Sequence, residues 1–221
     1  MHMSDFVFYF KIGWEHIINW SAVDHIFFVA ALAAIYLVKD WRQVLILVTA
    51  FTIGHAITLI LSAKSMITVN ENLVEFLIPC TIVCTALSNL FLKNFTPRSI
   101  RINYFLALFF GLIHGLAFAQ TLKWIVAEDQ SFWLAWFSFS VGLELGQIFV
   151  VLLILLLAQV FVGFFKLNRR YWVILISVVV LALALKMAID RWPWKEKKHA
   201  RAMIMEKRID FSSLIEGRII M

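Results

Sequence analysis

Several ionisable side chains stand inside long apolar stretches, where charged and polar groups are expensive to place. The group comprises His25, His55, His114, Asp24, Glu75 and Glu144. Imidazole and carboxylate groups together suit zinc, nickel, cobalt or iron, whereas calcium and magnesium prefer oxygen ligands alone. The pattern therefore predicts a buried site for a transition metal, with proton handling as the related alternative.

Each of these residues belongs to a polar stripe at helical spacing. Thr52 lies three residues before His55, while Ser140 and Gln147 lie four before and three after Glu144. Residues three and four apart share one face of a helix. We expect Thr52, Gln147 and Ser140 to hydrogen-bond to the metal-binding side chains and orient them.

Glycines flank two of the predicted ligands. Gly111 and Gly115 bracket His114, and Gly142 and Gly146 bracket Glu144. Small residues four apart let helix backbones approach closely. We therefore expect both side chains to lie beside helix-packing seams.

Two of the candidates have competing structural explanations. Asp24 follows Ser21 in the S-x-x-D pattern of a helix-start capping box, so it is predicted either to cap a helix or to bind the ion. His16 lies before the first apolar stretch, where a ligand and a simple helix contact are both open. His2 and His199, near the chain ends, are expected to take no part.

The composition is that of a membrane protein. Of the 221 residues, 62% are hydrophobic and 15% charged, whereas soluble domains carry roughly 25% charged residues. Stretches of about 20 uncharged residues are long enough to cross a bilayer. The net charge of +6 is scattered over loops and the tail, which argues against nucleic-acid binding. Cys80 and Cys84, one helical turn apart, are interpreted as small core residues.

The apolar stretches predict an all-α bundle of about six transmembrane helices preceded by an interfacial helix at 6–20. The expected spans are 22–38, 44–63, 73–92, 102–122, 132–161 and 171–189. Residues 1–195 would form a single domain and 196–221 a basic tail, in which Ile215 to Arg218 reads IEGR, a common protease-tag sequence. Basic residues in the odd-numbered loops place those loops in the cytoplasm and both termini outside, although the basic tail favours the reverse.

Most of the chain, from about Lys11 to Leu153, resembles the HupE/UreJ family of hydrogenase and urease accessory membrane proteins. The matching blocks are GWEHI with VDHIFF (13–28), FTIGHAITL (51–59), VEFLIPCTIVCTALSNLF (74–91), FGLIHGLAFAQTL (110–122) and FSFSVGLELGQ (137–147). The resemblance implies a multi-pass protein of the bacterial inner membrane associated with uptake of nickel, or sometimes cobalt, for metalloenzymes. The resemblance places the family's polar positions on nine residues of this sequence. They are His16, Asp24, His25, His55, Glu75, Asn89, His114, Glu144 and Gln147.

Three functions are compatible with these residues. The first is a nickel or cobalt permease, or an uptake accessory serving a metalloenzyme maturation system, in which the histidines bind the ion and the carboxylates supply charge or oxygen ligands. The second is an intramembrane zinc hydrolase acting on a lipid-like substrate, because three histidines, an open coordination position and an acidic base would suffice for it. The third is a metal-free scaffold whose polar residues hold helices together. We expect transport or accessory function rather than catalysis, and the sequence predicts no catalytic residue.

Overall fold

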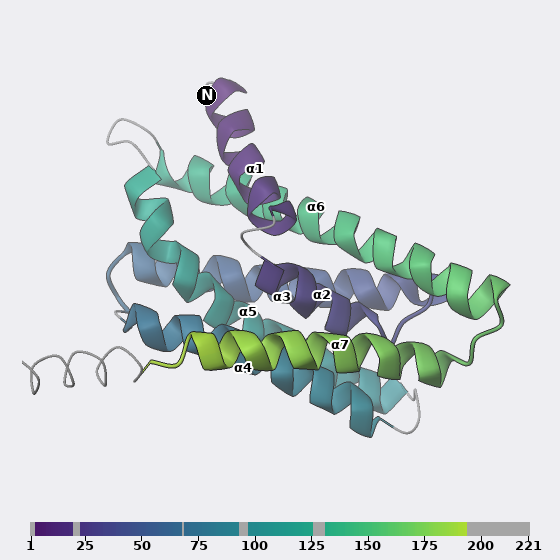
Figure 1. Ribbon diagram of the computed structural model, residues 1–221. Helices are drawn as coiled ribbons and strands as arrows, with labels where there is room; N and C mark the ends of the chain where they lie inside the picture. The colour runs from purple at the N-terminus through teal and green to yellow at the C-terminus, as the bar shows by residue number, and fades with distance from the viewer. Residues whose placement is uncertain (1–2, 20–22, 68, 93–96, 126–130, 194–221) are drawn as a thin grey trace, which may run out of the picture.

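The structure is a computed structural model that describes residues 3–19, 23–67, 69–92, 97–125 and 131–193. These residues form helices and short connections, with no strand among them (Figure 1). The helices are α1 (Met3–Ile18), α2 (Val23–Ala33), η2 (Val38–Asp40), α3 (Trp41–Ala63), α4 (Glu71–Phe91), α5 (Pro97–Ile125), α6 (Phe132–Ala158), η3 (Gln159–Phe164) and α7 (Arg169–Asp190). The all-α prediction is confirmed, and the predicted tail at 196–221 lies outside the described residues.

Four helical segments are long and apolar enough to cross a membrane. They are Val38–Ala63, Glu71–Phe91, Phe132–Phe164 and Arg169–Asp190. A fifth crossing is added if α1 and α2, which are bent by 69° relative to each other, count as one broken span. The described apolar part of α5 runs from Asn103 to Phe118. Each of the six predicted spans coincides with a helix, but by length and composition the described helices supply four or five crossings, not six.

The segment that continues α6 is the longest of these. Phe132–Phe164 has 33 residues, which at 1.5 Å per residue extends roughly 50 Å, well beyond a hydrocarbon core of about 30 Å. It ends in η3, one turn and a half of π-helix. A span of this length tilts within the bilayer or protrudes from it.

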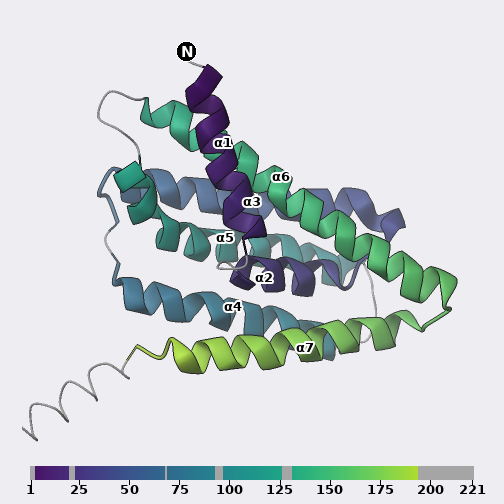
Figure 2. The same ribbon diagram turned by 45° about the horizontal axis from the view of Figure 1, so that its top comes forward.

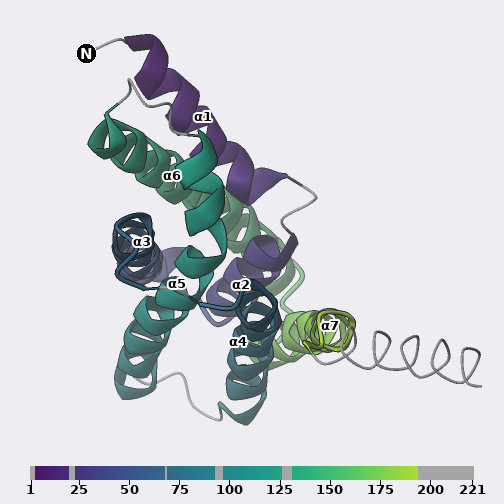
Figure 3. The same ribbon diagram turned by 90° about the vertical axis from the view of Figure 1, so that its left-hand side faces the viewer.

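The helices pack in three pairs around α2. Helix α3 packs along α5, α4 along α7, and α1 against α6. Figure 3 shows α2 surrounded by other helices, and it contacts α4, α6 and α7. Figure 2 shows α1 packed at an angle against the N-terminal half of α6. Phe28, Phe51 and Phe139, each at most 1% exposed, form the middle of the apolar core.

Candidate metal centre

Four helices bring four histidines together in the core. They are His16 of α1, His25 of α2, His55 of α3 and His114 of α5. Ring nitrogens of His16, His25 and His55 all lie within 4.8 Å of one another. Imidazoles gathered this closely are suited to bind a transition-metal ion. Of the sequence-predicted ligands, His16 was the least certain, yet it lies within this triad.

His114 lies beside the triad without belonging to it. Its ring centroid is 5.2 Å from that of His25, and its side chain is fully buried. The centroids of His16 and His25 are 4.6 Å apart. His25 therefore neighbours both His16 and His114.

The Nε2 atoms of all four histidines are buried and have no hydrogen-bond partner among the described residues. A buried polar atom left without a partner costs on the order of 1–3 kcal/mol. Four such atoms in one cluster are unusual, since most buried polar side-chain atoms are hydrogen-bonded. A bound cation would give the three triad histidines a partner at once, so this donor set fits a transition-metal ion.

Hydrogen bonds on the opposite ring nitrogens fix the protonation of two histidines. His25 Nδ1 lies 3.0 Å from Asp24 Oδ1, and His114 Nδ1 lies 2.8 Å from the carbonyl oxygen of Phe110. Carboxylates and carbonyls accept, so each Nδ1 must carry the proton. In the neutral ring, Nε2 then keeps its lone pair, which is the arrangement that metal-binding histidines use.

Asp24 is hydrogen-bonded to His25. Its Oδ1 also accepts from the backbone N–H of His25 at 2.9 Å, and its Oδ2 accepts from Arg191 Nη1 at 3.0 Å. Helix α2 begins at Val23, and Ser21 of the predicted capping box lies outside the described residues, so a capping role of Asp24 stays a prediction. Arg191, just beyond α7, thus joins a chain of contacts that ends at His25.

Aromatic rings surround the cluster. Phe118 and Phe139 stack at a centroid distance of 4.6 Å, and both lie against His16. Phe28 and Phe51 lie 5.2 and 5.1 Å from His114. These apolar walls exclude water, which strengthens electrostatic interactions with a bound charge.

Glycine seams hold the histidine-bearing helices at close range. A Cβ on Gly111 would overlap the carbonyl oxygen of Phe51, and one on Gly115 would overlap Thr58 Oγ1 and approach His55. Between α1 and α6, a Cβ on Gly13 would overlap the carbonyl oxygen of Phe139, and one on Gly142 that of Phe10. The close packing predicted at Gly111, Gly115 and Gly142 is confirmed. It places His55 opposite α5 and His16 opposite α6.

The predicted residues of α6 hydrogen-bond to partners other than the imidazoles. Glu144 Oε1 accepts from Thr49 at 2.6 Å, and Gln147 Oε1 accepts from Thr52 at 3.2 Å, so both tie α6 to α3. Ser140 donates to the carbonyl oxygen of Trp136 in its own helix.

Two further predicted residues come from α4. Asn89 donates to the carbonyl oxygen of Ala31 at 2.6 Å and so joins α4 to α2. Glu75 is exposed and lines a separate pocket at the start of α4. Within the described structure the carboxylates of Glu75 and Glu144 are thus not part of the histidine group.

Sequence reasoning missed Thr49 and Arg191. Thr49 lies three residues before Thr52 and could have been found by extending the polar stripe one turn. For Arg191, no local pattern points to Asp24, which lies 167 positions away in the chain. Cys80 and Cys84 are free thiols outside the histidine group, but Cys80 is half-buried and Cys84 is exposed, so the prediction that they are core residues is wrong.

Comparisons with known proteins agree with the geometry. No curated protein and no solved structure matches the chain. The model of the HupE / UreJ protein family matches residues 1–191, which include every described helix and all four clustered histidines. The apolar helices and the composition of this chain make it a multi-pass membrane protein, and the chain belongs to the HupE/UreJ family.

Proposed function

We propose that this protein is a permease or uptake accessory for a divalent transition-metal ion, with His16, His25 and His55 as its ion-binding ligands. The observation that carries the proposal is the set of four buried Nε2 atoms without partners, contributed by four different helices of a membrane protein. A site shared by four helices is one that relative helix motion can open and close, as transport requires.

Nickel or cobalt is the proposed ion. Imidazole ligands suit zinc, copper, iron and nickel, so the histidine group supports this class of metals, and the family resemblance supports nickel or cobalt within it. The ion is cargo in this proposal, to be released to a metalloenzyme maturation system. Asp24 would offset part of its charge through His25.

A polar stripe along α3 supports movement of an ion through the bundle. Thr49, Thr52, His55, Thr58 and Ser62 follow one another at intervals of three or four residues, and the last four are buried. The stripe extends to both sides of His55. Hydroxyl groups on either side of the site can take the place of water around a passing cation.

The zinc-hydrolase alternative has weaker support. It needs a carboxylate able to act as a base towards metal-bound water. Asp24, the carboxylate nearest the cluster, is engaged by His25 and Arg191, and Glu144 is engaged by Thr49. The metal-free scaffold leaves the four Nε2 atoms unexplained.

We propose that the protein lies in the bacterial inner membrane with both termini outside. Lys39, Arg42, Lys166, Arg169 and Arg170 lie at the end of the bundle where α3 and α7 begin. By the positive-inside rule this end faces the cytoplasm. The starts of α2 and α4, and with them His25 and Glu75, then lie towards the outer side.

Metal content of the detergent-purified protein tests the proposal. We expect near-stoichiometric nickel or cobalt in the native protein and loss of it in His16→Ala and His55→Ala, while His199→Ala keeps it. Circular dichroism and size-exclusion chromatography show whether each variant folds, and His55→Gln preserves polarity if His55→Ala does not fold. Proteoliposomes carrying an internal metal-sensitive dye then measure uptake. Unchanged metal in both cluster variants contradicts the proposal, and tightly held zinc would favour the hydrolase.

A further inference from the structure

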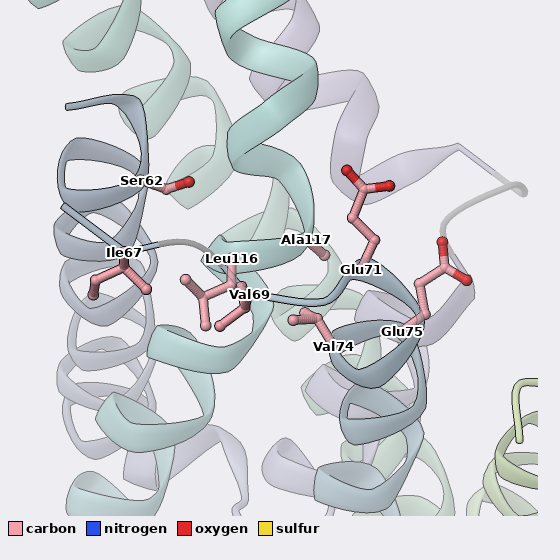
Figure 4. Close-up of a pocket in the computed structure, with 8 residues that line it drawn as sticks. All are labelled: Ser62, Ile67, Val69, Glu71, Val74, Glu75, Leu116 and Ala117. Atoms are coloured by element: carbon pink, nitrogen blue, oxygen red, sulfur yellow. The ribbon is translucent and has the colours of Figure 1, made fainter. Parts of the chain in front are cut away.

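A second polar site lies where α3, α4 and α5 meet. It is a pocket of about 180 Å³, shown in Figure 4. Its lining is Ser62, Ile67, Val69, Glu71, Val74, Glu75, Leu116 and Ala117. The pocket is separate from the histidine cluster but uses two of the same helices.

Two uncompensated carboxylates stand at this pocket. Glu71 and Glu75 are one turn apart on α4, and Figure 4 shows both carboxylates projecting to the same side of the helix. Like charges at this spacing repel each other. The helix start attenuates the charge of Glu71, but neither carboxylate forms an ion pair with any described residue.

Ser62 gives the pocket a buried polar wall. The residue is 5% exposed, and its side chain projects towards the pocket in Figure 4. Hydroxyls elsewhere in these helices bond to carbonyls of their own helix, as Thr58 does with Gly54 and His55. Among the described residues the Ser62 hydroxyl has no such partner, so it is free to bind a ligand in the pocket.

The pocket is close to the histidines along two helices. Ser62 lies seven residues after His55 on the α3 stripe, or roughly 10 Å along the helix axis at 1.5 Å per residue. Thr58 lies between them, and Gly115 of α5 packs directly against Thr58 and His55. Leu116 and Ala117, which line the pocket, follow Gly115 in the chain.

We propose that Glu71, Glu75 and Ser62 form a low-affinity, oxygen-lined site for hydrated divalent cations, which supplies ions to the histidine centre. Two carboxylates and a hydroxyl are hard oxygen ligands, which bind without the tight coordination that imidazoles provide. A cation there relieves the repulsion between the two carboxylates. The evidence for the cation site is the pocket itself. Its role as an entrance to the histidine centre rests on the proposed transport function.

Binding of Mn²⁺ tests the site without depending on transport. Mn²⁺ prefers oxygen ligands, and electron paramagnetic resonance measures the free ion directly. We compare the full-length native protein with E71Q/E75Q, with H55A and with Glu15→Gln, an exposed carboxylate on α1 paired with Lys11. We expect weak Mn²⁺ binding in the native protein, H55A and E15Q, and its loss in E71Q/E75Q. Equal binding in E71Q/E75Q, no binding in the native protein, or loss in H55A overturns the site.

Uptake of Ni²⁺ by proteoliposomes tests its role. We expect E71Q/E75Q to raise the half-saturating Ni²⁺ concentration several-fold at low ionic strength, with little change in the maximal rate, and the difference to shrink in high salt. An unchanged half-saturation value refutes the entrance role. Absence of uptake by the native protein refutes the proposed function, while the Mn²⁺ result still decides whether the cation site exists.

Discussion

Replacing Asp24 with asparagine should weaken metal binding although Asp24 touches no ion. The carboxylate accepts the proton of His25 Nδ1 at 3.0 Å and thereby directs the lone pair of Nε2 towards the cluster. An asparagine amide can instead donate to Nδ1, which would move the ring proton to Nε2 and block the ligand atom. The substitution preserves side-chain volume, so it removes charge and proton direction without creating a cavity.

The expected loss is 10- to 100-fold in affinity. Substituting a group that orients a metal-binding histidine typically costs about that much, which equals roughly 1.4–2.7 kcal/mol. We expect a loss of affinity at the upper end of this range, because Asp24 is 7% exposed and its two oxygens accept hydrogen bonds from three donors. Arg191→Gln should cause a smaller loss, since Arg191 reaches the site only through Asp24.

Competition with a chromogenic chelator in detergent, at fixed pH, measures the Ni²⁺ affinity of each variant. Glu15→Gln is the matched control, because it makes the same carboxylate-to-amide change next to His16 at an exposed position. A double-mutant cycle of Asp24→Asn with Arg191→Gln should show strong coupling. If folded Asp24→Asn binds Ni²⁺ as tightly as the native protein, His25 does not depend on Asp24 and the orientation argument is wrong.

Four further substitutions separate packing from binding. Gly111→Ala should destabilise the bundle by about 1–3 kcal/mol in a denaturation series, because its Cβ meets backbone of Phe51; Gly163→Ala, which meets only the flexible Gln159 side chain, should cost less. Asn89→Ala should lower the free energy of unfolding by about 1 kcal/mol without changing Ni²⁺ affinity, and a lowered affinity would show that Asn89 orients a ligand after all. His114→Ala should retain bound Ni²⁺ but slow proteoliposome uptake; loss of bound Ni²⁺ would place His114 in the resting site.

The helices and the histidine cluster were largely predictable because the membrane imposes a strong pattern on sequence. Charge-free stretches mark the helices, and an ionisable residue inside such a stretch is conspicuous through its cost. His25, His55 and His114 were identified on that basis alone. The glycine spacing around His114 also predicted that it lies beside a helix-packing seam, which the structure forms between α5 and α3 at Gly111 and Gly115.

The pairing of carboxylates with histidines was not predictable, because it depends on how helices are arranged around one another. In the sequence, nothing distinguishes the three carboxylates as partners of the histidines. In the structure, Asp24 is hydrogen-bonded to His25, Glu75 is exposed at a pocket, and Glu144 is hydrogen-bonded to Thr49. Length was misleading for the first span. The apolar stretch at 22–38 suggested a full crossing, whereas α2 ends at Ala33.

The shortness of α2 bears directly on how the site could work. Its 11 residues extend roughly 16 Å, about half of a 30 Å hydrocarbon core, so α2 needs α1 to complete a crossing. His16 and His25 stand on these two helices, which are bent by 69° relative to each other. Broken helices are a recurring feature of transporter ion sites. His16 is on α1, which packs against α6, whereas His25 is linked to Arg191 beyond α7 through Asp24. Motion of α1 relative to α2 would therefore separate His16 from His25 and leave His25 beside His114. An ion could then pass from one pair of imidazoles to the next without any helix unwinding.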